Sequence, residues 1–232
     1  MDRGMKMLSS PDIQAILVSL QAASLGTILG LPLAIGIAWV LVRSSFKGKA
    51  VLDILVSFPL VLPPVVTGYV MLIVLGRQGP IGSLLYQTLG INVVFTWVAA
   101  GLACCIVSLP LMVRAMEVAI SGIDPKMELA ARSLGAGPIK AFASITLPLA
   151  YRGIISAALI AFARGLGEFG ATMIVAGNIP GKTQTLPLAI FTNLQTGDDG
   201  NAIRLIVFSL ALASISLITH HMLLKRRGFR NQ

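Results

Sequence analysis

Charged side chains are scarce in this 232-residue chain: only 12% of its residues are Asp, Glu, Lys or Arg, and 56% are hydrophobic. A soluble domain carries roughly twice that charged fraction, so little soluble core is expected. Cysteine and histidine number two each. Cys104 and Cys105 are adjacent in an apolar run, where helical neighbours diverge by about 100° and form a poor disulfide. The sequence therefore lacks a disulfide framework and any metal-ligand spacing of Cys and His.

The sequence instead contains long apolar runs with few charged residues. Each is close to or above the roughly 20 residues that a bilayer core requires. A helix satisfies every backbone polar group internally in lipid, so each run is predicted to be helical. The five predicted spans are residues 13–42, 51–75, 93–113, 153–177 and 203–224. The sequence thus predicts an all-α, polytopic transmembrane bundle, with one domain at 13–224 and a basic cytoplasmic tail at 225–232.

The basic residues divide unevenly between the two sides of this bundle. Twelve of the eighteen Lys and Arg residues follow spans one, three and five, and five lie in the opposite set. Basic residues concentrate on the cytoplasmic side of a membrane. We therefore expect the N-terminus outside and the C-terminus inside. Topogenic charge also explains the formal net charge of +9, so lipid rather than nucleic acid is the expected partner.

The predicted loop at 114–152 is much longer than a simple connection needs. Asp124 suits a helix N-cap and Pro125 a first helical position. Gly135 and the Gly137-Pro138 pair then end the run of helix formers. A short charged helix between two breaks suits contact with a protein partner. The alternative is a solvated amphipathic loop.

A spaced motif runs through this loop. Its residues are Ala130, Ala131, Gly135, Ile145, Leu147 and Pro148, with Glu128 and Leu129 just before them. The pattern resembles the loop of permease subunits of binding-protein-dependent ABC importers, in which Glu-Ala-Ala precedes Gly, Ile and Leu-Pro. Leu129 stands where that family has Glu, and Glu128 lies beside it. The resemblance implies a coupling helix that docks in a cleft of a separate ATPase subunit.

Segments outside the loop indicate which branch of this permease family the chain resembles. Residues 62–69, 76–82, 164–172 and 176–187 are similar to molybdate permeases, and the likeness extends from about residue 13 onward. Sulfate and thiosulfate permeases share Gly-Glu-Phe-Gly at 167–170 and Ala-Gly-Asn at 176–178. The Gln-Thr-Leu-Pro stretch at 184–187 is closer to the molybdate branch.

This resemblance implies a type-I permease fold in the bacterial cytoplasmic membrane, with two copies of the chain around a central pore. An external oxyanion-binding protein would deliver molybdate, and a dimer of ATPase subunits would hold ATP and Mg. A sulfate, thiosulfate or tungstate permease is the alternative within the class. An ion-driven secondary transporter is less favoured, because the chain shows no internal repeat of the kind such folds use.

The chain itself is predicted not to be an enzyme and to hold no cofactor or metal. No Ser/His/Asp constellation is present. Residues 176–183 fit a loose phosphate-loop pattern. A phosphate loop needs a strand before it and a helix N-terminus after it, whereas here an apolar span precedes and Thr-Gln-Thr-Leu-Pro follows. ATP hydrolysis is therefore assigned to another subunit.

Arg164 and Glu168 are the informative polar residues within a predicted span. A charge at bilayer depth costs a few kcal/mol, so neither side chain should face lipid. Their i, i+4 spacing places them on one helix face, and Gly165 and Gly167 between them permit close helix approach or local flexibility. Two interpretations stay open: a structural ion pair, or a pore-side pair that lets an oxyanion pass.

The second predicted span contains Pro63 and Pro64, which remove backbone donors and open the helix. Broken helices are tolerated where they line a cavity, so these residues are candidates for the pore, a simple kink being the alternative. Thr67 is expected to donate its hydroxyl to one of the freed carbonyls.

Overall fold

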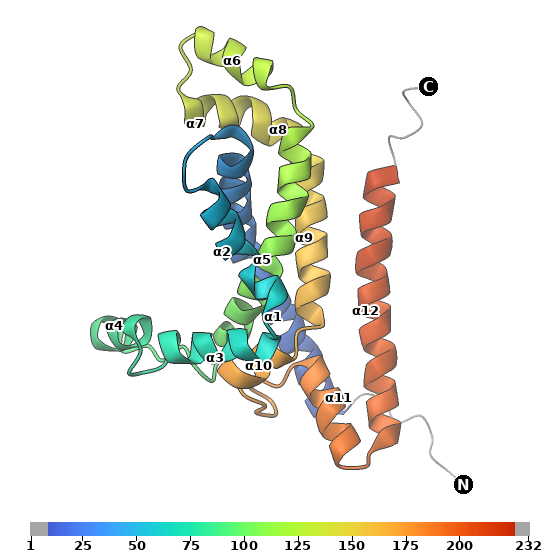
Figure 1. The fold of residues 1–232 in the computed structure, drawn as a ribbon. Coiled ribbons are helices and arrows are strands. Elements are labelled where there is room, and N and C mark those ends of the chain that lie inside the picture. The colour runs from blue at the N-terminus through green and yellow to red at the C-terminus, as the bar shows by residue number, and fades with distance from the viewer. Residues whose placement is uncertain (1–8, 226–232) are drawn as a thin grey trace.

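Three helices side by side form the centre of the protein in this computed structural model, which describes residues 9–225. They are α1 (Ser10–Arg43), α5 (Trp97–Ser121) and α9 (Tyr151–Leu166) (Figure 1). The described part of the chain is helical throughout, with no strand, and this confirms the predicted all-α class. The predicted tail, apart from the backbone of Lys225, lies outside the described residues.

Small residues allow these three helices to approach closely. A Cβ added to Gly26 of α1 would lie 2.8 Å from both the Cβ of Cys104 and the backbone nitrogen of Cys105 in α5. A Cβ on Gly165 of α9 would lie 3.2 Å from the Cα of Ala23 in α1. Helices in lipid associate through close packing of this kind, because the burial of apolar surface contributes little to the free energy of association there. Cys104 and Cys105 are buried in this packing as free thiols.

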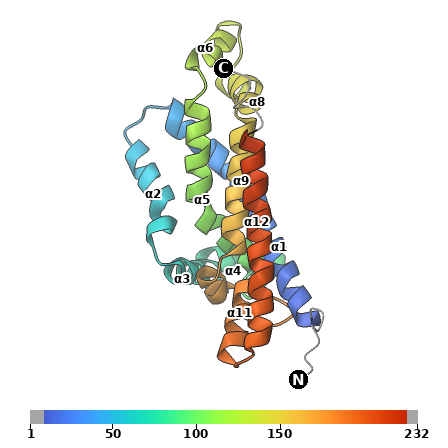
Figure 2. The same cartoon turned by 90° about the vertical axis from the view of Figure 1, so that its right-hand side faces the viewer.

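A long C-terminal hairpin stands beside this core. α11 (Leu186–Gln195) leads through a turn at Gly197 into α12 (Asp199–Lys225), which runs along α9 (Figure 2). Asp198 accepts a 3.2 Å hydrogen bond from the backbone of Asn201, so α12 begins four residues before the predicted fifth span. The hydroxyl of Ser216 donates to the carbonyl of Leu159 at 3.4 Å, joining α12 to α9.

The second predicted span, residues 51–75, is not one helix. α2 (Lys49–Val61) and α3 (Pro64–Leu75) meet at 113°, and α3 lies across the end of α2 (Figure 1). Pro63 and Pro64 lie at the joint, where the missing N–H groups end the hydrogen-bond ladder. α4 (Pro80–Leu89) continues outward from α3. The break expected at Pro63 and Pro64 is therefore present, as a bend of 113° rather than a simple kink.

The fourth predicted span, 153–177, is broken as well. α9 ends at Leu166, and α10 (Gly170–Val175) starts after the bend at Gly167 to Phe169. α10 packs crosswise on α3, because a Cβ on Gly68 would lie 2.7 Å from the carbonyl oxygen of Ala171. Tertiary contact thus fixes both broken helices against each other.

The third helix is longer than predicted. α5 runs to Ser121 rather than stopping near Val113, so Arg114 belongs to the helix and not to the loop. Arg114 donates to Asp53 of α2 at 2.6 Å and to Glu117 at 2.7 Å. Arg114 thus forms ion pairs on the surface of α5, and the helix continues past it.

Length and composition make three described helices candidate membrane spans: Ser10–Arg43, Trp97–Ser121 and Asp199–Thr219. Two bent pairs, Lys49–Val61 with Pro64–Leu75 and Pro138–Leu149 with Tyr151–Leu166, raise the number to five if each counts as one. The five-span prediction agrees with this upper count, although two of its spans are not straight helices.

The close packing of α1 on α5 predicts a difference between two glycines of the same helix. Gly26→Ala should destabilise the protein by about 1–3 kcal/mol, because the added carbon meets the backbone of α5. Gly36→Ala is the matched control, since nothing lies within 4 Å of its added carbon. It should leave stability unchanged or raise it by up to about 1 kcal/mol. Thermal unfolding of the detergent-purified variants measures both, and equal effects would contradict the packing.

Candidate functional site

The loop between α5 and α9, residues 122–150, lies at one end of the molecule and is called the docking loop after the contact expected of it. α6 (Pro125–Ser133) is followed by α7 (Pro138–Ala141), a π-helical turn at Phe142–Thr146, and α8 (Leu147–Leu149) (Figure 1). Asp124 caps α6 by accepting from the backbone of Lys126 at 2.9 Å. Gly135 adopts a φ of +90°, which only glycine takes readily. The predicted helix, break and helix are therefore present.

α6 is a polar helix, but exposed apolar side chains lie on it and beside it. None of its residues is buried. The exposed apolar side chains in and around it are Met127, Leu129, Leu134 and Ile139, and Leu134 is 90% exposed. Leu129, which replaces the family's Glu, belongs to this surface. Sequence reasoning did not single out Leu134 or Ile139, although both flank the glycine break.

The other motif residues fall into two groups. Ala130 and Pro148 are exposed, whereas Ile145 and Leu147 are half-buried toward the bundle. Ala131 is half-buried and accepts a hydrogen bond through its carbonyl from the backbone of Ala136 at 3.1 Å, which closes the end of α6. The motif thus combines an outward surface with an inward anchor.

Glu128 points inward rather than toward the exposed surface. Its Oε1 lies 3.1 Å from Nε of Arg43, the last residue of α1, and also accepts from the hydroxyl of Thr146. The Glu128 and Arg43 side chains are only 12% and 14% exposed. Sequence reasoning did not connect Arg43 with Glu128, because 85 positions separate the two residues.

Arg164 and Glu168 form the predicted ion pair at the end of α9, with 2.8 Å between Nη1 and Oε2. Glu168 is 2% exposed and Arg164 is 32% exposed. The second oxygen of Glu168 accepts from the backbone nitrogen of Ala171 at 2.8 Å, which caps the start of α10. The carboxylate therefore holds the α9–α10 break together, while the Arg164 side chain stays partly exposed.

The two glycines of this segment have different surroundings. Gly165 is buried against α1, and its carbonyl lies 3.5 Å from the sulfur of Cys104, so it serves close helix approach. Gly167 has only the carbonyl of Arg164 near the position of an added Cβ, at 3.9 Å. Gly167 therefore belongs to the bend and not to a helix contact.

Thr67 does not do what its position suggested. Its hydroxyl is buried, yet it has no hydrogen-bond partner among the described residues. The carbonyl of Pro63 instead accepts from the backbone nitrogens of Val66 and Thr67 at 2.8 and 3.3 Å. The helix restarts after the 113° bend, so the backbone N–H groups of its first turn satisfy the Pro63 carbonyl and leave the Thr67 hydroxyl no role there. The predicted back-bond was wrong.

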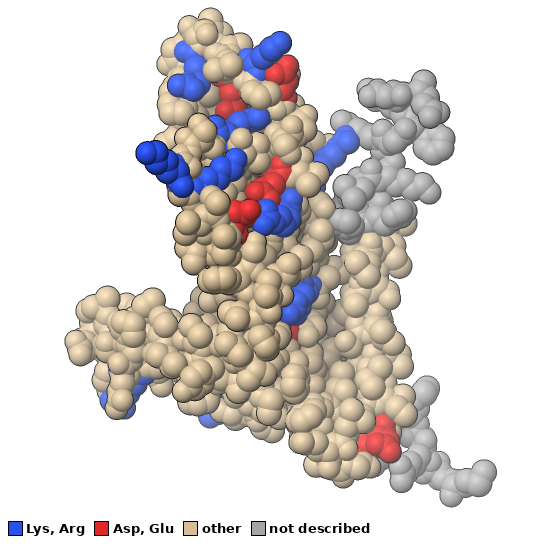
Figure 3. All heavy atoms as spheres, viewed as in Figure 1, with Lys and Arg blue, Asp and Glu red and all other residues tan. Residues whose placement is uncertain are grey.

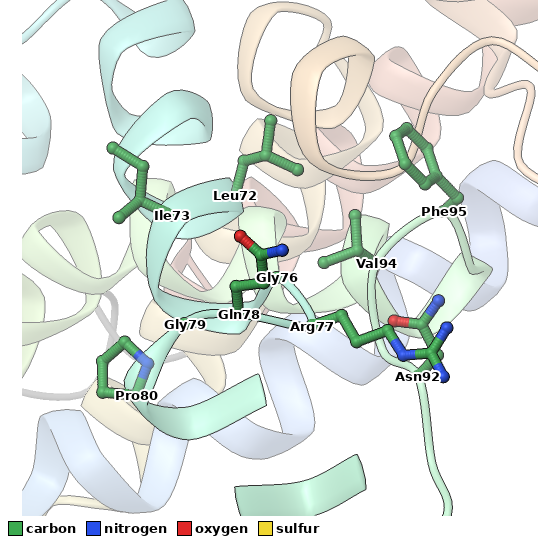
Figure 4. A pocket seen from close by; sticks show the side chains of 10 residues that line it. All are labelled: Leu72, Ile73, Gly76, Arg77, Gln78, Gly79, Pro80, Asn92, Val94 and Phe95. Carbon is green, nitrogen blue, oxygen red and sulfur yellow. The ribbon is translucent and has the colours of Figure 1, made fainter. Parts of the chain in front are cut away.

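A cavity of about 600 Å³ lies at the far end of α3 from α2. Its lining includes Arg77 and Gln78 from the turn before α4, and Asn92 and Phe95 from the segment before α5 (Figure 4). The guanidinium of Arg77 lies 4.0 Å from the ring centre of Tyr86, which holds it at the cavity edge. Sequence reasoning had placed Arg77 and Gln78 in a turn and Phe95 in the third predicted span, and it did not bring them together.

The segment resembling a phosphate loop uses its polar groups internally. Thr183 donates to the carbonyl of Gly177 at 3.1 Å and accepts from the backbone of Ile179 at 3.2 Å. The amide of Gln184 donates to the side chain of Asn178 at 2.9 Å. The next helix, α11, begins only at Leu186. Among the side chains that the structure describes, which do not include those of His220 and His221, no group of three His, Cys, Asp or Glu could hold a metal.

The ion pair at the α9–α10 break predicts a non-additive effect on stability. Arg164→Ala should cost about 3 kcal/mol, because it strands the buried carboxylate of Glu168. The double variant Arg164→Ala/Glu168→Ala should be more stable than Arg164→Ala alone, since no uncompensated charge remains. Thermal unfolding in one detergent compares the variants, and a double variant with the summed loss would contradict the pairing.

Comparison with known proteins gives consistent matches along the chain. The model of the family described as binding-protein-dependent transport system inner membrane component matches residues 26–227. The molybdenum transport system permease protein ModB of Escherichia coli (strain K12) is 51% identical over 213 residues, covering 91% of this chain and 93% of that protein. A probable sulfate transport system permease protein of Chlorokybus atmophyticus is 37% identical, with 88% and 70% covered.

The fold has a counterpart among solved structures. A chain of a bacterial alginate ABC transporter, solved with its periplasmic protein, superimposes with a TM-score of 0.66 at 20% identity. The match covers 94% of this chain and 80% of that chain, and it confirms the predicted permease fold. The chain therefore belongs to the family of inner membrane components of binding-protein-dependent transport systems.

Proposed function

We propose that this chain is the permease subunit of an ATP-driven importer that carries molybdate across the cytoplasmic membrane. The observation that carries the proposal is the 51% identity, over nine-tenths of the chain, to a permease named for molybdenum transport. The relative named for sulfate transport is more distant, at 37%. Molybdate is therefore favoured over sulfate, thiosulfate or tungstate as the transported anion.

The architecture supports partners on both sides of the membrane. The exposed apolar surface of α6 suits docking to an ATPase subunit, which would hold ATP and Mg, because large apolar side chains at an unpaired end mark protein contacts. Charged side chains gather at this end of the molecule (Figure 3). This distribution supports a cytoplasmic docking loop, with the N-terminus outside and the C-terminus inside. An oxyanion-binding protein would dock at the opposite end.

A second copy of the chain would complete the pathway. α2 and α3 have few buried residues, namely Val56, Thr67, Gly68 and Met71. Apolar side chains on these helices, such as Ile54, Phe58 and Tyr69, are about half exposed. The exposed apolar side chains alone could face lipid. The ion pair of Arg114 and Asp53 between α2 and α5, however, is exposed on the same side. Ionisable groups at membrane depth face a water-filled cavity or a partner, which favours a pathway beside this face.

The decisive measurement is uptake by proteoliposomes that contain this chain, its ATPase and its binding protein. We expect labelled molybdate to accumulate only with ATP, and to do so in the presence of excess sulfate. Uptake that sulfate abolishes while sulfate itself accumulates would replace the anion and keep the class. Uptake without ATP would favour an ion-driven secondary transporter and contradict the proposal.

The role proposed for Arg164 is to favour the oxyanion at the break between α9 and α10, while Glu168 prevents tight binding. The Arg164 side chain is 32% exposed, so part of it stays accessible although it is paired with Glu168. A free buried cation would trap a divalent anion, whereas a paired cation lets it pass. Pro63, Pro64 and Thr67 would border the same break, since Pro64 lies against Gly170.

Transport by the charge-free double variant separates this role from a purely structural one. Arg164→Ala/Glu168→Ala should insert and fold, yet its molybdate uptake should fall at least about tenfold, because a charged hydrogen-bonding partner of the anion is gone. The amount of folded protein in the vesicles is the control. Wild-type uptake by this variant would show that the pair only stabilises the fold.

A further inference from the structure

The docking loop is joined to α1 by a compact polar cluster of three side chains: Arg43, Glu128 and Thr146. Arg43 ends α1, Glu128 lies in α6, and Thr146 ends the π-helical turn. Both Arg43 and Thr146 donate to the same carboxylate oxygen of Glu128. Thr146 is fully buried, and the other two are largely so. Three segments distant in sequence therefore meet at one oxygen atom.

Arg43 also reaches the end of α5. Its Nη2 donates to the carbonyl of Ile123 at 2.8 Å and to the carbonyl of Ile120 at 3.3 Å. Ile120 lies in the last turn of α5, where carbonyls lack partners within the helix and carry partial negative charge, and Ile123 lies two residues beyond the end of the helix. One guanidinium thus caps α5 and pairs with α6 at the same time. Its planar fork of donors allows this, whereas a lysine ammonium offers a single point charge.

An aromatic contact joins the same end of α1 to the π-helical turn. The rings of Trp39 and Phe142 have centroids 4.7 Å apart. Trp39 lies one helical turn before Arg43, so two successive turns of α1 hold the loop. π-helical turns are rare and occur frequently at functional sites. The loop is therefore anchored by an aromatic pair and a charged cluster together.

α1 continues without a break from this cluster to the Arg164 segment. It remains helical through Pro32, and Ala23 in its first half packs on Gly165, the neighbour of Arg164. Residues this tightly packed shift together rather than deform. A displacement of the docking loop would therefore reach the α9–α10 break through α1.

We propose that Arg43 is the positioning residue through which movement of the docking loop is passed to α1 and α5. This inference rests on the proposed function only in assuming that an ATPase moves the docking loop. The contacts that join the loop to α1 and α5 are present in this chain whatever it transports. Arg43 touches neither the anion nor ATP. It acts by holding Glu128 and the end of α5 in one rigid unit.

The joint can be tested in the full-length chain without substrate. Arg43→Ala should raise hydrogen exchange at the α6 amides at least about tenfold, because a buried charged hydrogen bond is lost. Lys47→Ala is the matched control, since it removes an exposed cation four residues later and should leave exchange unchanged. Equal exchange in wild type and Arg43→Ala would overturn the joint, whatever the protein transports.

The transmission is tested in proteoliposomes with the ATPase and the binding protein. Arg43→Ala should keep ATPase assembly and ATP hydrolysis but lower the molybdate transported per ATP by about five- to tenfold, the range of a modest coupling energy. Arg43→Lys should recover part of this ratio by keeping the charge. A wild-type ratio in Arg43→Ala, with wild-type uptake normal, would refute transmission through Arg43 while leaving the proposed function intact.

A double-variant cycle shows whether Arg43 acts through Glu128. Glu128→Gln keeps the size of the side chain and removes its charge. If the two residues form one unit, Arg43→Ala/Glu128→Gln should lower the transport ratio no further than the more affected single variant. Losses that multiply would show that the two residues act independently and would contradict the cluster as the route. Absence of uptake by the wild-type chain would instead count against the proposed function.

Discussion

The structure depends on the close approach of α1, α5 and α9, which is possible because small residues lie at their closest points of contact. Gly26 of α1 meets the backbone of α5, and Gly165 of α9 meets Ala23 of α1. In lipid, such contacts replace the burial of apolar surface as the source of helix association. Every other element is placed relative to this three-helix core: α12 along α9, the docking loop beyond α5, and α3 across α10 through Gly68.

Two ion pairs join neighbouring segments to this tightly packed core. Arg164 and Glu168 sit where α9 ends, and the carboxylate joins the two halves of the broken segment. Arg43 and Glu128 sit where α1 ends, and they join the docking loop to the core. Each carboxylate is largely buried and therefore needs both its cation and a second donor. Two ends of one rigid core thus carry the two ion pairs on which the proposed functions rest.

Patterns local in sequence were predictable, and patterns that depend on contact were not. Asp124, Pro125 and Gly135 set the bounds of α6 through capping and a left-handed turn, and each signal is visible within a few residues. The i, i+4 spacing likewise predicted the pairing of Arg164 with Glu168. The break at Pro63 and Pro64 was foreseeable too, because proline removes a backbone donor. The bond expected of Thr67 was wrong, and the packing of α3 on α10 through Gly68 could not be read from the sequence.

The sequence by itself determined that the chain is a helical membrane protein with a helical docking loop, since apolar length, basic residues and caps each act through local chemistry. Tertiary structure alone decided which glycines contact a neighbouring helix, which face of α6 is exposed, and that Glu128 turns inward. It also brought Arg43 to Glu128 across 85 residues. No periodicity or spacing encodes such a contact, because it exists only after α1 and α5 have packed and set the end of one helix beside the loop that follows the other.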